Sequence, residues 1–122
     1  MAVHQRDVYI LPFPLNSKVE DHPFIVLSVN EANEYEKTFI GVMITSMGFV
    51  DDFSFPLLDE MFEKKLEKKN CHARMHLVTL CLKKEIIGSK DKYVNKMKPQ
   101  FFKQLMAAIG DLIFNYEFTP LI

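Results

Sequence analysis

The order of its apolar segments constrains the fold of this chain more than any other sequence feature. Three β-branched apolar runs, at residues 24–29, 38–44 and 73–82, are typical of strands. A single later segment, at residues 99–116, repeats its apolar positions every three or four residues, as an amphipathic helix does. Because no helices alternate with the strands, a βαβ arrangement is disfavoured. This order predicts a mainly-β or α+β fold, in which a twisted antiparallel sheet or small barrel is packed by a C-terminal helix.

Shorter segments complete the expected secondary structure. Residues 8–11 indicate a buried strand that ends at Pro12-Phe13-Pro14, because proline lacks the N–H group that a central strand needs. The remaining predictions are a loop at 15–21, one helical turn at 30–36, a short strand at 51–56, and a short amphipathic helix or ordered excursion at 58–66.

Length and composition predict a single domain that spans residues 1–122. A chain of 122 residues that is 48% apolar can bury a core without disulfides or metal. Cys71 and Cys81 match no metal or redox spacing, so we expect free thiols in a reducing compartment. The first residues are too polar for a signal peptide, and no uncharged run is long enough to cross a bilayer. We therefore expect a soluble cytoplasmic protein, with no cofactor and no membrane partner.

The first candidate for chemistry is the pair Arg74 and His76. Residues two apart on a strand project from the same face. A guanidinium can clamp a phosphate through two hydrogen bonds, and an imidazole can move a proton at neutral pH. Together they are suited to metal-free cleavage of RNA, in which the 2′-hydroxyl attacks the neighbouring phosphate. The alternative is an exposed strand face that carries ordinary polar residues, and the formal net charge of −1 favours no nucleic-acid partner.

Two further groups of polar residues lie at strand ends. Thr45 and Ser46 follow the third apolar run, where hydroxyls can bind a phosphate or simply cap a turn. His22 precedes Pro23 and follows two acids, so it is either an imidazole beside carboxylates or part of a solvated loop. Cys71-His72 with His76 lacks a fourth ligand for zinc, and we reject a metal site. The lysines of residues 63–69 alternate with acids and are interpreted as a solvated helix face.

Short motifs follow one another along almost the whole chain. They are Asp7-Val8-Tyr9-Ile10, Phe13-Pro14, His22-Pro23-Phe24-Ile25-Val26-Leu27-Ser28, Ile44-Thr45-Ser46, and Ala73-Arg74-Met75-His76-Leu77-Val78-Thr79 with the helix segment behind it. In this order and spacing they resemble the MazF/PemK/Kid family of toxin ribonucleases. The resemblance implies an SH3-like barrel, a homodimer that binds single-stranded RNA across its interface, and neutralisation by a small antitoxin protein.

The chain departs from the family pattern at three positions. Arg6 stands where a glycine is usual, His22 where an arginine is usual, and His76 where Kid-like members have an acid. Arg74, Thr45 and Ser46 match the pattern. The resemblance therefore implies a retained phosphate clamp with a changed proton-transfer group. The expected catalytic residues are Arg74, His76, Thr45, Ser46 and His22.

Three functions are compatible with these residues. The leading hypothesis is a metal-independent endoribonuclease toxin of a type II toxin-antitoxin system. The second is a non-catalytic relative that keeps the fold as a binding module, which the two substituted histidines and the near-zero charge favour. The third is a gyrase poison like CcdB. It ranks last because that activity goes with a C-terminal Trp-Gly-Ile signature, and this chain has no tryptophan.

Overall fold

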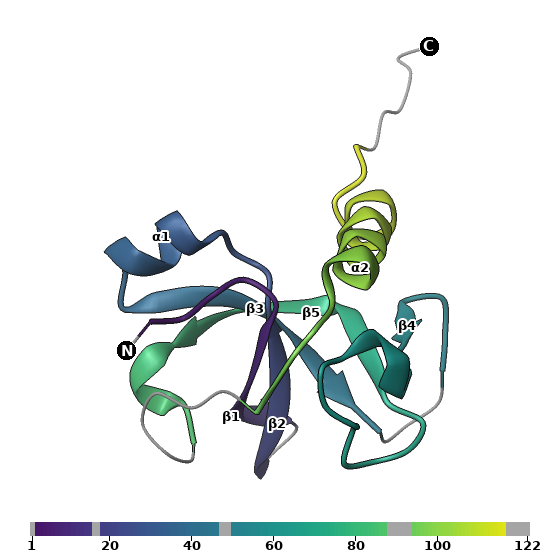
Figure 1. The fold of residues 1–122 in the computed structure, drawn as a ribbon, viewed down its shortest axis with the longest axis horizontal. Helices are drawn as coiled ribbons and strands as arrows, with labels where there is room; N and C mark the ends of the chain where they lie inside the picture. The colour runs from purple at the N-terminus through teal and green to yellow at the C-terminus, as the bar shows by residue number, and fades with distance from the viewer. Residues whose placement is uncertain (1, 16–17, 47–49, 88–93, 117–122) are drawn as a thin grey trace.

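The computed structural model describes residues 2–15, 18–46, 50–87 and 94–116, which form one antiparallel six-stranded sheet with two α-helices (Figure 1). The strand order is β4-β5-β3-β2-β1-β6, and every pairing is antiparallel. The strands are β1 (Asp7–Leu15), β2 (Lys18–Val26), β3 (Thr38–Thr45), β4 (Ser54–Pro56), β5 (His72–Leu82) and β6 (Asn95–Lys96). The helices are α1 (Asn30–Tyr35) and α2 (Pro99–Leu112), with 3₁₀ turns at Asp59–Met61 and Lys83–Glu85. The predicted mainly-β or α+β class with a C-terminal helix is confirmed.

The sheet buries apolar side chains on both of its faces. Alternate residues of a strand point to opposite faces, so neighbours in β2 belong to different clusters: Ile25 to one and Phe24 to the other. The first cluster lies between the sheet and α2, whose Phe102, Leu105 and Ile109 pack into it. In Figure 1, α2 lies over the region where β3 and β5 meet. The second cluster covers the opposite face and includes Tyr9, whose ring lies 6.2 Å from that of Phe39.

The two edges of the sheet approach each other without pairing as strands. Among the described residues, β4 and β6 form the edges, so the ladder stays open and the closed SH3-like barrel is not confirmed. The chain that follows β4 nevertheless meets the chain around β6. An isolated bridge joins Phe62 to Met97, and the backbone N–H of Lys98 donates to the carbonyl of Met61 at 2.8 Å. Residues 64–68 and Asn95, on the two sides of this contact, line the cavity of the candidate site.

The prediction that β1 ends before Pro12 is wrong, because the strand continues through Pro14 to Leu15. Val8 accepts a backbone hydrogen bond from Val94, on the side of β1 away from β2. Pro12 and Pro14 have the same parity as Val8, so their nitrogens face that side and no ladder bond to β2 is lost. The predicted loop at 15–21 is wrong for residue 15, which ends β1, and for residues 18–21, which belong to β2. Residues 16 and 17 lie outside the described residues.

The segment at residues 58–66 is an ordered excursion and not an amphipathic helix. Only Asp59–Met61 forms a turn of 3₁₀ helix, after which residues 63–71 form neither helix nor strand. Met61 and Phe62 are both buried, although they are adjacent, and Leu66 packs against the first cluster. The last helix ends earlier than predicted: it stops at residue 112, and Tyr116 is 82% exposed beyond it.

Candidate active site

A cavity of about 450 Å³ lies where β2 and β3 cease to pair. The ladder between these strands runs only from Val26 and Gly41 to Phe24 and Met43, although both strands continue past that point. Residues 20–23 of β2 and 44–46 at the end of β3 therefore line a gap and not a continuous sheet. The remaining lining residues are 64–68, Cys71, Val8, Ile10, Ile87, Val94 and Asn95.

Acidic and basic residues line different walls of this cavity. Glu20 and Asp21 come from the β2 side. Lys64, Lys65 and Lys68 come from the irregular segment after the 3₁₀ turn, together with Glu67. One wall is thus acidic and the wall built by the irregular segment is predominantly basic.

His22 contributes a buried ring nitrogen without a hydrogen-bond partner to the described lining of the cavity. Its side chain is buried, and its Nε2 atom has no hydrogen-bond partner within the described residues. The nearest charged atom is Oε2 of Glu20 at 3.8 Å, which is too long for a hydrogen bond. A buried imidazole nitrogen without a partner costs free energy unless a ligand or water satisfies it. His22 therefore marks this wall as a place where a bound water or a ligand would complete the hydrogen bonding.

Thr45 and Ser46 lie on the opposite strand end of the same cavity. Both are half-buried, and both line it together with His22. Continuing the β2–β3 register beyond Phe24 and Met43 brings Thr45 level with His22 on the adjacent strand. The structure thus brings three of the five predicted site residues together.

Arg74 and His76 are not among the residues that line this cavity. The guanidinium of Arg74 makes a two-pronged contact with Asp51, with Nη1 2.9 Å from Oδ1 and Nη2 3.1 Å from Oδ2. Nη1 also donates to the hydroxyl of Ser54 at 2.8 Å. The hydrogen bonds from Arg74, followed by the backbone N–H of Phe53, lower the pKa of Asp51 to about 2. In this structure the arginine fork is engaged by a carboxylate of the same chain.

His76 occupies the same face of β5 as Arg74, as the strand alternation predicts. Met75 between them is buried, whereas His76 is exposed and its ring packs edge-on against Phe53, with centroids 5.7 Å apart. The structure therefore divides the predicted residues into a cavity group of His22, Thr45 and Ser46 and a β5 group of Arg74 and His76.

The structure also identifies residues that sequence reasoning did not assign to the site. His72 pairs with Thr45 across the β3–β5 ladder and is 3% exposed, and both of its ring nitrogens lack hydrogen-bond partners within the described residues. His72 does not itself line the cavity. The sequence had singled it out only beside Cys71, as part of the rejected zinc site. The lysines of the irregular segment and Asn95 carried no signal, because their positions depend on contacts between distant parts of the chain.

Solved structures of similar fold include MazF proteins and an endoribonuclease. A MazE-MazF structure from Deinococcus radiodurans is 11% identical, covers 93% of this chain and 98% of its own, and has a TM-score of 0.71. An endoribonuclease from a mycobacterial species is 13% identical, with coverages of 91% and 90% and a TM-score of 0.67. The Mycobacterium tuberculosis toxin MazF-mt6 is 12% identical, with coverages of 87% and 94% and a TM-score of 0.65. At these identities the similarity shows the fold alone.

The sequence itself settles the family. The profile of the PemK-like, MazF-like toxins of type II toxin-antitoxin systems matches residues 4–113. The chain therefore belongs to this toxin family, as its ordered motifs predicted. A comparison with curated proteins finds no match. In the described part of the chain, no helix is long and apolar enough to span a membrane.

The contact between Arg74 and Asp51 can be tested by titration. Because Arg74 lowers the pKa of Asp51 to about 2, the contact stabilises the fold above the ordinary aspartate pKa of 3.8, and this stabilisation is lost as pH falls through about 2. Arg74→Ala should return the Asp51 pKa toward 3.8, and Arg74→Lys should give an intermediate value. The measurement is an NMR titration of the Asp51 carboxyl carbon. A wild-type pKa near 3.8 would show that the guanidinium is free in solution.

Proposed function

We propose that this chain is a toxin that cleaves single-stranded RNA without a metal ion, and that the cavity between the ends of β2 and β3 is its active site. The observation that carries the proposal is His22. It lines the cavity beside Thr45, its Nε2 is buried without a partner among the described residues, and it stands where the family pattern has arginine. Three observations support this chemistry: membership of the MazF-like toxin family, the fold shared with solved endoribonucleases, and a buried imidazole nitrogen without a partner among the described residues.

The proposed reaction uses only groups of the chain and the RNA. The ribose 2′-oxygen attacks the adjacent phosphorus, His22 accepts the proton of the 2′-hydroxyl, and the bond from phosphorus to the 5′-oxygen breaks. The His22 imidazolium passes this proton to the leaving 5′-oxygen, which gives a 2′,3′-cyclic phosphate and a 5′-hydroxyl. The hydroxyls of Thr45 and Ser46 donate hydrogen bonds to the phosphate oxygens as negative charge develops there.

In this proposal the β5 group has a supporting role. Arg74 holds Asp51 and Ser54, and thereby fixes the start of β4 against β5. For Arg74 to bind a phosphate, it would have to exchange the carboxylate of Asp51 for the RNA. His76 contacts Phe53 on an exposed face, so it is not positioned beside the cavity lining.

We further propose a small antitoxin as protein partner. The solved relatives include MazE-MazF complexes from Deinococcus radiodurans and a mycobacterial endoribonuclease with its cognate antitoxin. Membership of the toxin family extends this expectation to the present chain. A toxin that cleaves RNA acts in the cytoplasm, which is therefore the proposed location.

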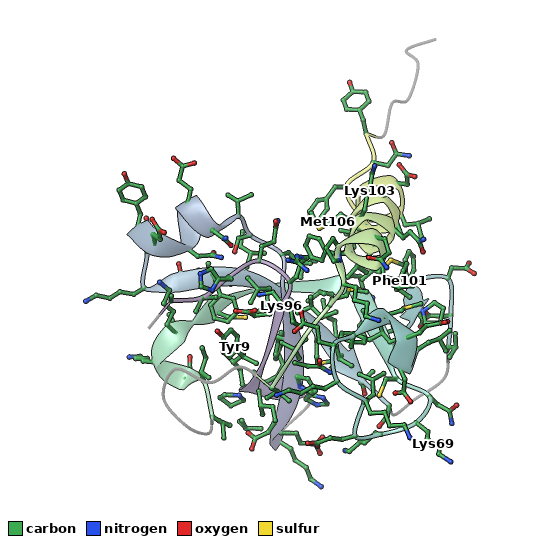
Figure 2. The ribbon with its side chains drawn as sticks, viewed as in Figure 1. Tyr9, Lys69, Lys96, Phe101, Lys103 and Met106 are labelled. Atoms are coloured by element: carbon green, nitrogen blue, oxygen red, sulfur yellow. The ribbon has the colours of Figure 1, made fainter. Side chains whose placement is uncertain are left out.

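We propose a homodimer formed through the part of the first face that α2 leaves uncovered. Ile40 and Leu80 pair across β3 and β5 and are 42% and 66% exposed. Leu80 lies two residues beyond Val78, which packs against the first cluster under α2. Figure 2 shows Met106 on the side of α2 that faces α1, and this side chain is also exposed. A second copy of the chain would bury these apolar groups.

The proposed activity predicts different effects for two histidine substitutions. His22→Ala should reduce metal-free RNA cleavage by about 10²–10⁴, the contribution typical of general acid–base catalysis. His76→Ala is the matched control and should cleave at close to the wild-type rate, because its imidazole lies outside the cavity lining. The assay follows cleavage of a mixed-sequence RNA in the presence of EDTA.

Two outcomes of this assay would contradict the proposal. Loss of activity in His76→Ala but not in His22→Ala would show that the proton-transfer residue lies on β5. If the wild type cleaves no RNA and its expression does not slow growth, the non-catalytic binding module becomes the better account.

The dimer can be tested with one exposed apolar position and one control. Leu80→Asp should shift the protein from dimer to monomer in light scattering at micromolar concentration, because a charge on the proposed interface would be buried without a partner. Val19→Asp, at an equally exposed position on β2, should leave the dimer intact. A wild-type monomer under these conditions would rule out this interface.

A further inference from the structure

The irregular segment that forms the basic wall is held at defined points. Asn95 binds both backbone groups of Lys64: its Oδ1 accepts from the Lys64 N–H at 2.9 Å, and its Nδ2 donates to the Lys64 carbonyl at 2.9 Å. Further along, the N–H of Leu66 donates to Oδ1 of Asp59 at 2.9 Å. A segment without secondary structure normally relies on such side-chain bonds to satisfy its backbone groups. Here they also fix where the lysines lie.

Asn95 is itself held firmly. It is 4% exposed, and its Oδ1 accepts a second hydrogen bond, from the backbone N–H of Lys96. Lys96 forms a 2.6 Å ion pair with the buried carboxylate of Asp7 on β1. The position of Lys64 is thus tied, through Asn95, to the part of the sheet that also bears the cavity.

The consequence is a selective placement of the lysines. Lys64, Lys65 and Lys68 line the cavity, whereas Lys69 does not. In Figure 2, Lys69 extends from the molecule at the end of this segment, away from the body of the protein. The interpretation of this stretch as a helix face is therefore wrong, because the described segment is not helical. Its lysines are exposed to solvent, as predicted, and three of them also line the cavity.

We propose that this segment is the phosphate-binding wall of the RNA site, and that Asn95 is the positioning residue that holds it in place. The proposal rests on the proposed function. With His22 in place of the family's arginine and Arg74 engaged by Asp51, the lysines are the permanent cations that the described cavity lining contains. An ammonium group neutralises a phosphate as a point charge, without reading the base sequence.

The opposite wall sets the direction of the bound strand. The carboxylates of Glu20 and Asp21 repel phosphates from the β2 side of the cavity. An RNA backbone that follows Lys65 and Lys68 would therefore turn its sugars toward His22, the arrangement that removal of a 2′-hydroxyl proton requires. Charge separation thus orients the substrate, and net charge near zero is no obstacle to binding.

The test measures RNA binding separately from cleavage. A fluorescent single-stranded RNA whose 2′-hydroxyls are all methylated cannot be cleaved, and its affinity is measured by anisotropy over a range of salt concentrations. For single strands, each phosphate contact contributes about 0.7 to the slope of log affinity against log salt. Lys68→Gln should make this slope shallower by about 0.7, while the matched neighbour Lys69→Gln should leave it unchanged.

The role of Asn95 has its own readout. Asn95→Ala should reduce the slope as the double variant Lys65→Gln/Lys68→Gln does, by about 1.4. Combining Asn95→Ala with the double variant should reduce it little further, because the lysines no longer face the strand. A circular dichroism spectrum of Asn95→Ala that matches the wild type excludes unfolding as the cause of this non-additivity.

The outcomes separate the two proposals. If the wild type binds and cleaves RNA, and Lys68→Gln and Lys69→Gln have equal slopes, the phosphate-wall proposal is overturned and the proposed function stands. Full additivity of Asn95→Ala with the lysine substitutions would remove Asn95 as a positioning residue. If the wild type neither binds the methylated strand nor cleaves RNA, both proposals fail.

Discussion

The early end of the ladder between β2 and β3 is the constraint on which the candidate site depends. Up to Phe24 and Met43 the two strands are joined by backbone hydrogen bonds and bury side chains on both faces. Beyond that pair the two strands no longer pair with each other, although β2 still pairs with β1 and β3 with β5. The space between them becomes the cavity that His22 and Thr45 line. If β2 and β3 were hydrogen-bonded along their whole length, their backbone groups would all be paired, but no space would remain for a ligand.

A second contact completes the cavity from a distant part of the chain. The segment after β4 meets the residues around β6, and Asn95 fixes this contact by bonding both backbone groups of Lys64. The open sheet is therefore drawn together at its edges without closing its ladder. In our account, the same contact that links the edges of the sheet supplies the cationic wall, so the fold and the proposed phosphate site depend on the same few bonds.

The sequence predicted those features that repeat locally and missed those that arise between distant segments. β-branched runs and a helical stripe sufficed for the sheet and for α2. The predicted end of the first strand before Pro12 was wrong, because a proline interrupts a strand only where its nitrogen faces a hydrogen-bonded partner strand. Family resemblance placed His22, Thr45 and Ser46 in one site with Arg74 and His76. The capture of Arg74 by Asp51, 23 residues earlier, has no local signal. Asn95 and Lys64 are 31 positions apart, and only the folded chain joins them.

The central claim, that RNA occupies this cavity, can be tested directly through the two cysteines. Cys71 lines the cavity, whereas Cys81 lies in the second apolar cluster, where burial raises its pKa to about 12. The measurement is the rate at which iodoacetamide alkylates each thiol, followed by mass spectrometry with and without saturating 2′-methylated single-stranded RNA. We predict that RNA slows alkylation of Cys71 and that Cys81 stays unreactive in both conditions. Bound RNA that leaves the alkylation rate of Cys71 unchanged would contradict the account.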